Sequence, residues 1–484
     1  MFDVAIIGAG IVGSFIAHDL SKKECSVLVL DKNADIANGA SMANSAIVHS
    51  GHDPKEGTLK ARLNVQGNRM YEEICKELGV SFKRTGAFVA AANQDEEAIL
   101  DTLLQQAKGR NIEASLLSGE EARKLEKNLS RNVTRVLNLP TTGIIYPWEV
   151  AIALMEEAII NGTTCRLSEE VTAIEKQEHY ILHTSKGSYD AKFVINAAGV
   201  YADHIYQMAL TGSKKETEVP FHIRPRRGVY YVLDHTREPL VSRVIYPVPG
   251  AAGKGVLVVP TTHDNILLGP DSEFVEDKDG NNTTAEELAL VKNSVSKTVE
   301  NIPFDKIIRT FAGLRPTGDT GDFVIEESKV LNGFVNVACI ESPGLASAPA
   351  ISEYVLEEVM KNSLQYPDKK EYIHRKKNIC LAGMSDEEKN ELVKKSPEFG
   401  QIVCRCEQIT KGEILDAIRR PAGATTVKGI KKRVRPGMGR CQGGFCEPAI
   451  VEILSEELHI STLDVRLDGE ESVMLMEQTK KEAD

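Results

Sequence analysis

The sequence predicts an α/β protein in which two interleaved lobes are followed by a small C-terminal domain. Three observations predict this architecture. A glycine-rich strand, turn, helix and strand pattern opens the chain, strand-like segments separated by Pro and Gly dominate residues 220–340, and four of the nine cysteines gather after residue 400. The length of 484 residues corresponds to about three domains.

The first 31 residues predict a dinucleotide-binding βαβ unit. Gly8, Gly10 and Gly13 match G-x-G-x-x-G directly after an apolar strand and open a helix. The first two glycines permit a tight turn and close approach of a pyrophosphate, and the third lets the helix pack on the strand. Asp31 ends the second strand, where a carboxylate accepts hydrogen bonds from an adenosine ribose. The N-terminal position of the unit, and the late return of a companion strand at 193–199, favour FAD over NAD.

The rest of the first 400 residues alternates helical and strand patterns. Helical periodicity covers 57–78, 94–108, 150–160 and 342–360, and strand-like runs cover 171–174, 181–184, 193–199, 228–233, 255–260, 265–269 and 333–338. The apolar run at 193–199 is typical of a strand buried on both faces of a parallel sheet, so we assign it to the first sheet. Residues 220–340 predict a mixed or antiparallel sheet that forms a second lobe, and residues 362–400 predict a charged connector with one short helix.

Four cysteines predict a metal or cluster site. Cys404, Cys406, Cys441 and Cys446 form a C-x-C-x34-C-x4-C pattern, and four thiolates need a cation or a cluster to offset their charge. A [2Fe-2S] cluster accepts four thiolates at varied spacings. Zinc is the alternative, although its ligand pairs usually run C-x2–4-C, and unligated thiols are a third. The other five cysteines are scattered singly and are expected to be small buried hydrophobes.

A basic segment precedes the second cysteine pair; its members are Lys428, Lys431, Lys432, Arg433, Arg435 and Arg440. It is poorly suited to nucleic acid, because it has few interleaved aromatic residues. Two interpretations stay open. The cations either raise the reduction potential of an anionic cluster or form a solvated basic face.

Composition excludes several classes of protein. Hydrophobic residues make up 42% of the chain and charged residues 26%, as in an ordinary globular protein. The net charge of −12 argues against sequence-independent binding of nucleic acid or anionic lipid. No apolar run approaches the ~18 residues of a membrane-spanning helix, and the N-terminus lacks a secretory signal. We therefore expect a cytoplasmic protein in a reducing compartment, which reaches the inner face of a membrane only through a partner.

Several stretches resemble a known family, and together they span about residues 1–360. They are Gly8 to Gly13, residues 44–51, Tyr246 to Pro249, Leu267 to Pro270, Gly313 to Pro316 and Ser342 to Leu345. This portion resembles the FAD-dependent oxidoreductases that are similar to D-amino-acid oxidase, in the branch of glycerol-3-phosphate and L-2-hydroxyglutarate dehydrogenases. Residues 401–455, above all 437–446, resemble the [2Fe-2S] domain first described in bacterioferritin-associated ferredoxin.

The resemblance implies a division of the chain. An FAD-binding, Rossmann-like lobe (about 1–90, 145–215 and 310–360) is interleaved with a mixed or antiparallel β substrate lobe (about 90–145 and 215–310). A linker at 361–400, a [2Fe-2S] domain at 401–455 and an acidic tail at 456–484 follow. The family more often has Glu where Asp31 stands, which shortens the reach to the ribose by one methylene.

The resemblance also implies site residues. Those expected to bind FAD, besides Gly8, Gly10, Gly13 and Asp31, are Ser41, Asn44, Ser45, Val171, Gly199, Gly313, Gly344 and Leu345. Gly344 and Leu345 open a helix whose positive N-terminal end would face the reduced flavin ring.

Three residues are expected to act on the substrate. His49 and His263 are the candidate bases, because a neutral imidazole titrates in the useful range. Arg315 is the candidate anion anchor, because a guanidinium matches a carboxylate or phosphate. Arg226, Arg227 and Lys254 are expected to add positive potential in the second lobe.

The function implied is an FAD-dependent dehydrogenase that oxidises sn-glycerol 3-phosphate to dihydroxyacetone phosphate and passes electrons through the cluster to a partner redox subunit or quinone. One alternative oxidises a 2-hydroxy acid such as L-2-hydroxyglutarate. Another is a non-catalytic electron-transfer subunit. Because FAD takes two electrons and a [2Fe-2S] cluster takes one, the pairing favours a dehydrogenase over an oxidase.

Overall fold

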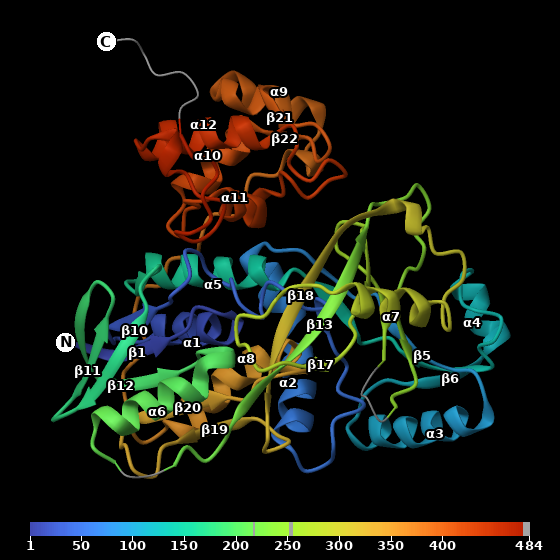
Figure 1. The fold of residues 1–484 in the computed structure, drawn as a ribbon, viewed down its shortest axis with the longest axis horizontal. Helices are drawn as coiled ribbons and strands as arrows, with labels where there is room; N and C mark the ends of the chain where they lie inside the picture. The colour runs from blue at the N-terminus through green and yellow to red at the C-terminus, as the bar shows by residue number, and fades with distance from the viewer. Residues whose placement is uncertain (216–217, 251–254, 478–484) are drawn as a thin grey trace.

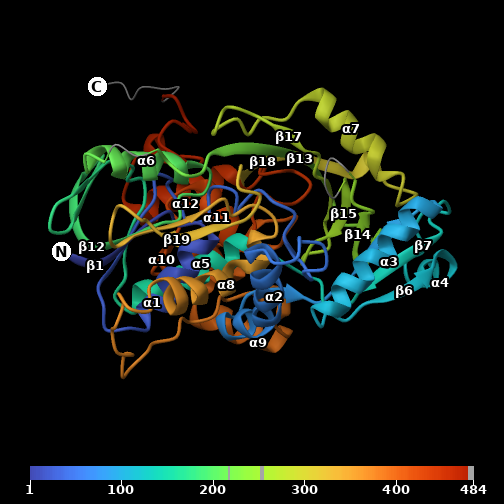
Figure 2. The same cartoon turned by 90° about the horizontal axis from the view of Figure 1, so that it is seen from below.

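The computed structural model describes residues 1–215, 218–250 and 255–477, so Lys254 lies outside the described residues. Figures 1 and 2 show two lobes side by side, with the C-terminal domain set against the side of the first lobe that carries α5 (Pro147–Ile160). Within the described residues, no helix combines the length and the apolar character that crossing a membrane would require.

The first lobe is built on an eight-stranded sheet with a parallel centre. β1 (Phe2–Ile7) lies between β2 (Val27–Leu30) and β12 (Gly187–Asn196) and is parallel to both. β12 also pairs in parallel with β20 (Phe334–Ala338), which confirms that the 193–199 strand belongs to this sheet. The outer strands are β9 (Thr164–Arg166), β10 (Val171–Lys176), β11 (Tyr180–Thr184) and β19 (Val324–Glu327).

Helices cover both faces of this sheet, which explains its continuous apolar strands. One face packs on α1 (Ile11–Ser21), α2 (Leu59–Leu78), α5 (Pro147–Ile160) and α8 (Gly344–Tyr354), and the other on α6 (Ala202–Gly212). α2 begins where the Thr58 side chain accepts from the Ala61 N–H and ends at Gly79, which has the left-handed conformation that stops a helix. The helix expected over 342–360 is α8, continued by a π-helical turn at Val355–Val359.

The second lobe is a nine-stranded mixed sheet. Its longest strands, β13 (Ile223–Leu233) and β18 (Ile307–Gly318), pair antiparallel along their length. The other strands are β5 (Ala87–Ala91), β6 (Ser115–Ser118), β7 (Arg135–Leu139), β14 (Val244–Pro247), β15 (Leu257–Pro260), β16 (Ile266–Gly269) and β17 (Glu273–Phe274). Its helices are α3 (Gln94–Gly109), α4 (Gly119–Leu125) and α7 (Ala285–Val295). The parallel pair β5 and β14 makes the sheet mixed rather than purely antiparallel.

A small three-stranded sheet joins elements of the two lobes. It consists of β3 (Ile47–Val48), β8 (Gly143–Ile145) and β4 (Phe82–Lys83). Because β3 directly precedes His49, this sheet fixes the position of the candidate base.

The C-terminal domain has its own apolar core. It contains β21 (Ile402–Cys404), β22 (Ile409–Thr410), α10 (Lys411–Arg419), α11 (Val427–Val434) and α12 (Glu447–Leu458), and α9 (Asp386–Lys395) precedes it in the connector. The residues after α12, expected as an acidic tail, fold back onto α11. The carbonyl oxygens of Arg466 and Leu467 accept from the N–H groups of Val427 and Lys428, and Val465 is fully buried.

Candidate functional site

A cavity of about 1190 Å³ lies where the two lobes meet. Its wall comes from the turn between β1 and α1, residues 38–49, the start of α8 and the facing strands β13 and β18. The size exceeds that of most small-molecule pockets and suits a dinucleotide together with a small substrate.

Two glycines on the cavity wall allow close backbone contacts that a larger residue would prevent. Gly8 has a φ of +110°, and a Cβ there would collide with the carbonyl oxygen of Ala197. A Cβ on Gly313 would collide with the carbonyl oxygen of Ala43. Both glycines, with Gly10 and the first residues of α1, line the cavity. The glycine turn thus lies on the cavity wall at the positive end of α1, where a pyrophosphate binds, and these residues fit FAD.

Asp31 lines the cavity but is already engaged with the glycine turn. Its Oδ2 accepts from the Ala9 N–H at 2.7 Å, and its Oδ1 accepts from the backbone and side chain of Asn33 at 2.8 and 2.9 Å. Burial raises the pKa of Asp31, against the hydrogen bonds and the positive charge of Lys432. A carboxylate has about four acceptor sites, so it can still accept from a ribose hydroxyl.

The loop after Asp31 holds three further residues expected to bind FAD. Ser41 Oγ accepts from the N–H of Ile11 at 2.9 Å, at the start of α1. Asn44 uses its side chain within the loop, and Ser45 Oγ lies 3.0 Å from the Tyr230 hydroxyl. All three line the cavity, as do Val171, Gly199, Gly313, Gly344 and Leu345.

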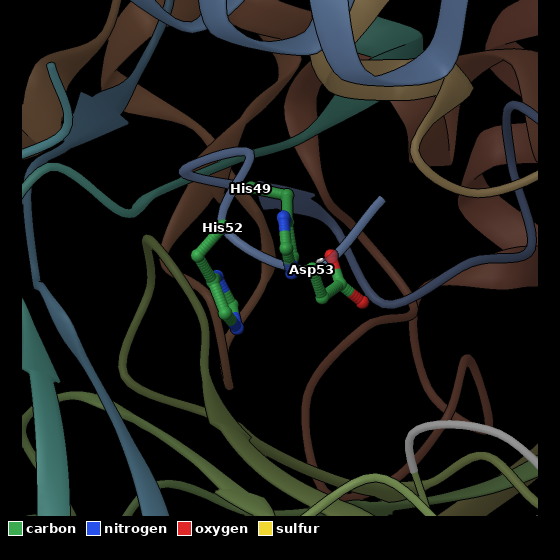
Figure 3. A group of neighbouring side chains, drawn as sticks. All are labelled: His49, His52 and Asp53. Atoms are coloured by element: carbon green, nitrogen blue, oxygen red, sulfur yellow. Dashed lines mark ion pairs between the residues drawn. The ribbon is translucent and has the colours of Figure 1, made fainter. Parts of the chain in front are cut away.

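His49 lies on the cavity wall and is buried. Its ring stacks on His52 with centroids 4.7 Å apart, and its Nε2 is 3.5 Å from Oδ1 of Asp53 (Figure 3). Asn64 of α2 donates to the His49 carbonyl oxygen at 2.7 Å, and its Oδ1 is 3.3 Å from Nδ1 of the ring. Nδ1 accepts from the Gly51 N–H at 3.1 Å, so the neutral ring carries its proton on Nε2, the nitrogen that faces Asp53. The Asp53 carboxylate stabilises the imidazolium that forms when the ring gains a second proton.

Arg315 lines the same cavity from β18. Its guanidinium donates to three carbonyl oxygens, those of Arg226, Arg227 and Asp271, at 2.7–3.2 Å. Among the described residues no carboxylate forms an ion pair with it. Burial lowers the pKa of Arg315, but a guanidinium stays charged at physiological pH. The carbonyl oxygens fix its orientation and leave a net positive charge facing the cavity.

Arg226 and Arg227, the two described cations that were expected nearby, are neutralised. Arg226 lines the cavity and pairs with Glu341 at 2.8 Å, and Lys60 pairs with the same carboxylate at 2.8 Å. Arg227 pairs with Glu287 at 2.9 Å and Glu273 at 3.0 Å and does not line the cavity. Arg227 is therefore a structural residue of the second sheet rather than a source of potential in the site.

His263 is not placed with His49. Within the described chain it is absent from the cavity wall, and its ring stacks on Tyr146 at 5.2 Å. Burial and the nearby charge of Arg435 lower the pKa of His263 to about 4, so it is neutral at physiological pH. His263 lies in the turn between β15 and β16, and its ring lies in an aromatic stack with Tyr146 and Trp148.

No sequence pattern singled out four of the cavity residues. They are Asp53, Tyr230, Tyr246 and Glu341. The Tyr246 hydroxyl is buried and has no hydrogen-bond partner among the described residues, as expected of a group that meets a ligand. Tyr246 lies in a stretch that carried the family resemblance, which was the one available signal.

The four cysteines meet as two pairs at one end of the C-terminal domain. The sulfurs of Cys406 and Cys441 are 3.5 Å apart. Burial and the neighbouring Cys404 thiol raise the pKa of Cys446 to about 12. Two sulfur pairs match a [2Fe-2S] cluster, in which each iron takes two thiolates. Among the described residues no three of these sulfurs lie within 4.8 Å of one another, whereas a zinc ion at ~2.3 Å from each would bring all four closer.

The basic segment does not form a solvated face. Arg433 and Lys432 of α11 pair with the buried Asp35 of the first lobe at 2.9 and 2.8 Å. Arg435 pairs with Glu407 at 3.0 Å and donates to the Tyr146 hydroxyl at 3.2 Å. Most of these cations therefore dock the C-terminal domain on the lobes, and only Arg440 is largely exposed.

Comparison with known proteins agrees with this geometry. Residues 3–358 match the family of FAD-dependent oxidoreductases, and residues 402–456 match the BFD-like [2Fe-2S] binding domains. The glycerol 3-phosphate dehydrogenase of Caloramator mitchellensis is 47% identical over 486 residues, covering 100% of both chains. The L-2-hydroxyglutarate dehydrogenase of Indibacter alkaliphilus is 32% identical over 252 residues, 51% of this chain and 61% of that one.

A solved structure supports the same family assignment. The L-alpha-glycerophosphate oxidase of Mycoplasma pneumoniae with FAD bound superposes with a TM-score of 0.74 at 28% identity, covering 78% of this chain and 99% of that one. FAD and a [2Fe-2S] cluster are thus the two cofactors, and zinc is set aside. The chain belongs to the FAD-dependent oxidoreductase family and carries a BFD-like [2Fe-2S] binding domain.

Proposed function

We propose that this chain is a dehydrogenase that oxidises sn-glycerol 3-phosphate to dihydroxyacetone phosphate and sends the electrons out through its [2Fe-2S] domain. Arg315 carries the proposal: it is a cation without a carboxylate partner in the described chain, on the wall that also bears the buried His49. A small anionic alcohol satisfies both groups at once. The full-length similarity to the Caloramator glycerol 3-phosphate dehydrogenase supports a phosphate as the anion.

The reaction removes a hydride from the alcohol carbon and a proton from its oxygen. FAD, when bound, accepts the hydride, and the cluster takes electrons one at a time. His49 accepts the hydroxyl proton, held in place by Asn64 and Gly51 and supported by Asp53. Arg315 binds the phosphate and so fixes the distance between the anion and the reacting carbon.

Electrons leave at the C-terminal domain in this proposal. Cys441 is partly exposed, and Phe445, next to the ligand Cys446, is 83% exposed. A partner redox subunit or a quinone can approach this end without entering the cavity. We place the protein in the cytoplasm, where such a partner would bring it to the inner face of the membrane.

The substrate is tested by reduction of the bound flavin without oxygen. We expect sn-glycerol 3-phosphate to bleach the visible flavin band within one turnover, and L-2-hydroxyglutarate to leave it unchanged. Bleaching by the 2-hydroxy acid alone would assign the chain to the alternative dehydrogenase. Bleaching by neither would assign it to a non-catalytic electron-transfer subunit.

The base is tested by paired histidine substitutions. We expect His49→Asn to slow flavin reduction by glycerol 3-phosphate about 100-fold or more, since a positioned general base contributes that much. His263→Asn is the matched control, because it removes a half-buried imidazole outside the cavity, and we expect a change of less than about threefold. Stopped-flow rates at equal FAD content provide the measurement. Similar losses in both variants would contradict the assignment of His49.

A further inference from the structure

We propose that the C-terminal domain closes the nucleotide end of the FAD site, so that retention of FAD depends on the docked, cluster-bearing domain. This inference rests on the family's cofactor and not on the proposed substrate. It concerns two residues, Lys428 and Asp468, that lie outside the segment expected to bind FAD and yet line the cavity.

The segment from Asp31 to Ser41 contacts both the cavity wall and α11. Its two ends meet the cavity, where Asp31 accepts from the Ala9 N–H and Ser41 accepts from the Ile11 N–H, both in the glycine turn and the start of α1. The position of this segment therefore fixes both ends of the turn that receives the pyrophosphate.

Other residues of this segment contact α11. Arg433 makes two hydrogen bonds of 2.9 Å to the carboxylate of Asp35, and Lys432 donates to the carbonyl oxygen of Ile36. Burial raises the pKa of Asp35, but the charges of Arg433 and Lys432 outweigh it and hold that pKa well below its usual range. Buried ions with matched partners tie α11 to the segment, because separation would leave each charge uncompensated.

A second set of contacts reaches the cavity itself. Asn38 donates to Oδ1 of Asp468 at 2.6 Å, and Lys428 donates to the other oxygen of the same carboxylate. The Lys428 ammonium has three N–H donors, so bonding to Asp468 leaves capacity for an anionic or hydroxyl group of the nucleotide. The C-terminal domain thus adds a cation and a carboxylate to the wall beside Asn38.

The cluster supports this docking surface. α11 lies between the two cysteine pairs in the chain and shares one apolar core with α10 and α12. A cluster bound by Cys404, Cys406, Cys441 and Cys446 holds the ends of this core together. By linkage, if the cluster stabilises the docked domain and the docked domain tightens FAD binding, loss of the cluster must weaken FAD binding.

The test is the dissociation constant of FAD, measured by fluorescence titration of deflavinated full-length protein without substrate. We expect Lys428→Met to raise it about tenfold, as for loss of one charge-assisted contact, and Arg433→Met to raise it further. Arg419→Met is the matched control, since Arg419 pairs with Glu457 within the C-terminal domain and is exposed. It should leave the constant within about twofold of the parent value.

A second measurement removes the cluster from the unmodified chain with an iron chelator and follows free FAD in the filtrate. We expect faster FAD release from the iron-free protein than from the parent. The proposal is overturned if Lys428→Met, with its iron content intact, binds FAD as tightly as the parent, or if chelation leaves FAD release unchanged. Neither outcome bears on the identity of the substrate, which is tested separately by flavin bleaching.

Discussion

Replacing Arg315 with leucine is expected to lower kcat/KM for glycerol 3-phosphate about 100-fold or more, while the flavin remains bound. Arg315 lines the cavity and forms no ion pair with a carboxylate of the described chain, and truncating one partner of a buried charge pair costs about 2–5 kcal/mol. The measurement is the rate of anaerobic flavin reduction across substrate concentrations, at matched FAD content.

Two further variants separate anion binding from folding. Arg315→Lys keeps the charge but loses the planar fork that also bonds three carbonyl oxygens, so we expect only partial recovery. Arg224→Leu, on the neighbouring strand and largely exposed, removes an ion pair with Glu276 outside the cavity and should leave the rate unchanged. A full rate in Arg315→Leu would contradict the role of Arg315 as the anion anchor.

Replacing Cys441 with serine is expected to remove the cluster and to stop electron exit while substrate still reduces the flavin. The sulfur of Cys441 lies 3.5 Å from that of Cys406, so the substitution breaks one of the two pairs. With FAD in excess, we expect flavin reduction within about threefold of the parent and transfer to cytochrome c, which is too large to enter the cavity, at least about 100-fold slower.

Cys380→Ser is the matched control, because Cys380 is an exposed single cysteine in the connector. It should keep the iron content, the visible spectrum and the transfer rate of the parent. Zinc in place of iron in the parent protein, or transfer that persists in iron-free Cys441→Ser, would show that electrons do not leave through the cysteine domain.

The amino-acid sequence was sufficient to predict a site wherever that site is built from residues that are neighbours in the chain. Gly8, Gly10 and Gly13 predict their own turn, because the pyrophosphate site is made by successive backbone groups at one helix start. The two cysteine pairs likewise predict a metal or cluster site, with zinc left open, because the ligands within each pair recur at short spacing. Arg315 was found through the family stretch around it.

Other positions could not be predicted, because their role depends on distant partners. His263 sits in a hairpin that has the composition of a site loop, but packing directs its ring onto Tyr146. The basic residues of α11 predict only a charged helix. Their partner Asp35 is 398 positions away from Arg433, and no local pattern encodes that pairing.

The sequence by itself therefore predicted a dinucleotide site and a cysteine cluster site, the order of the elements and the chemistry available at each motif, because these depend on short-range backbone geometry and residue type. Only the tertiary structure decided which histidine faces the cavity, which arginine keeps its charge free of a carboxylate, and that the cluster domain forms a wall beside the nucleotide turn. Those features arise from burial and charge pairing between segments that meet only when both lobes and the C-terminal domain are assembled.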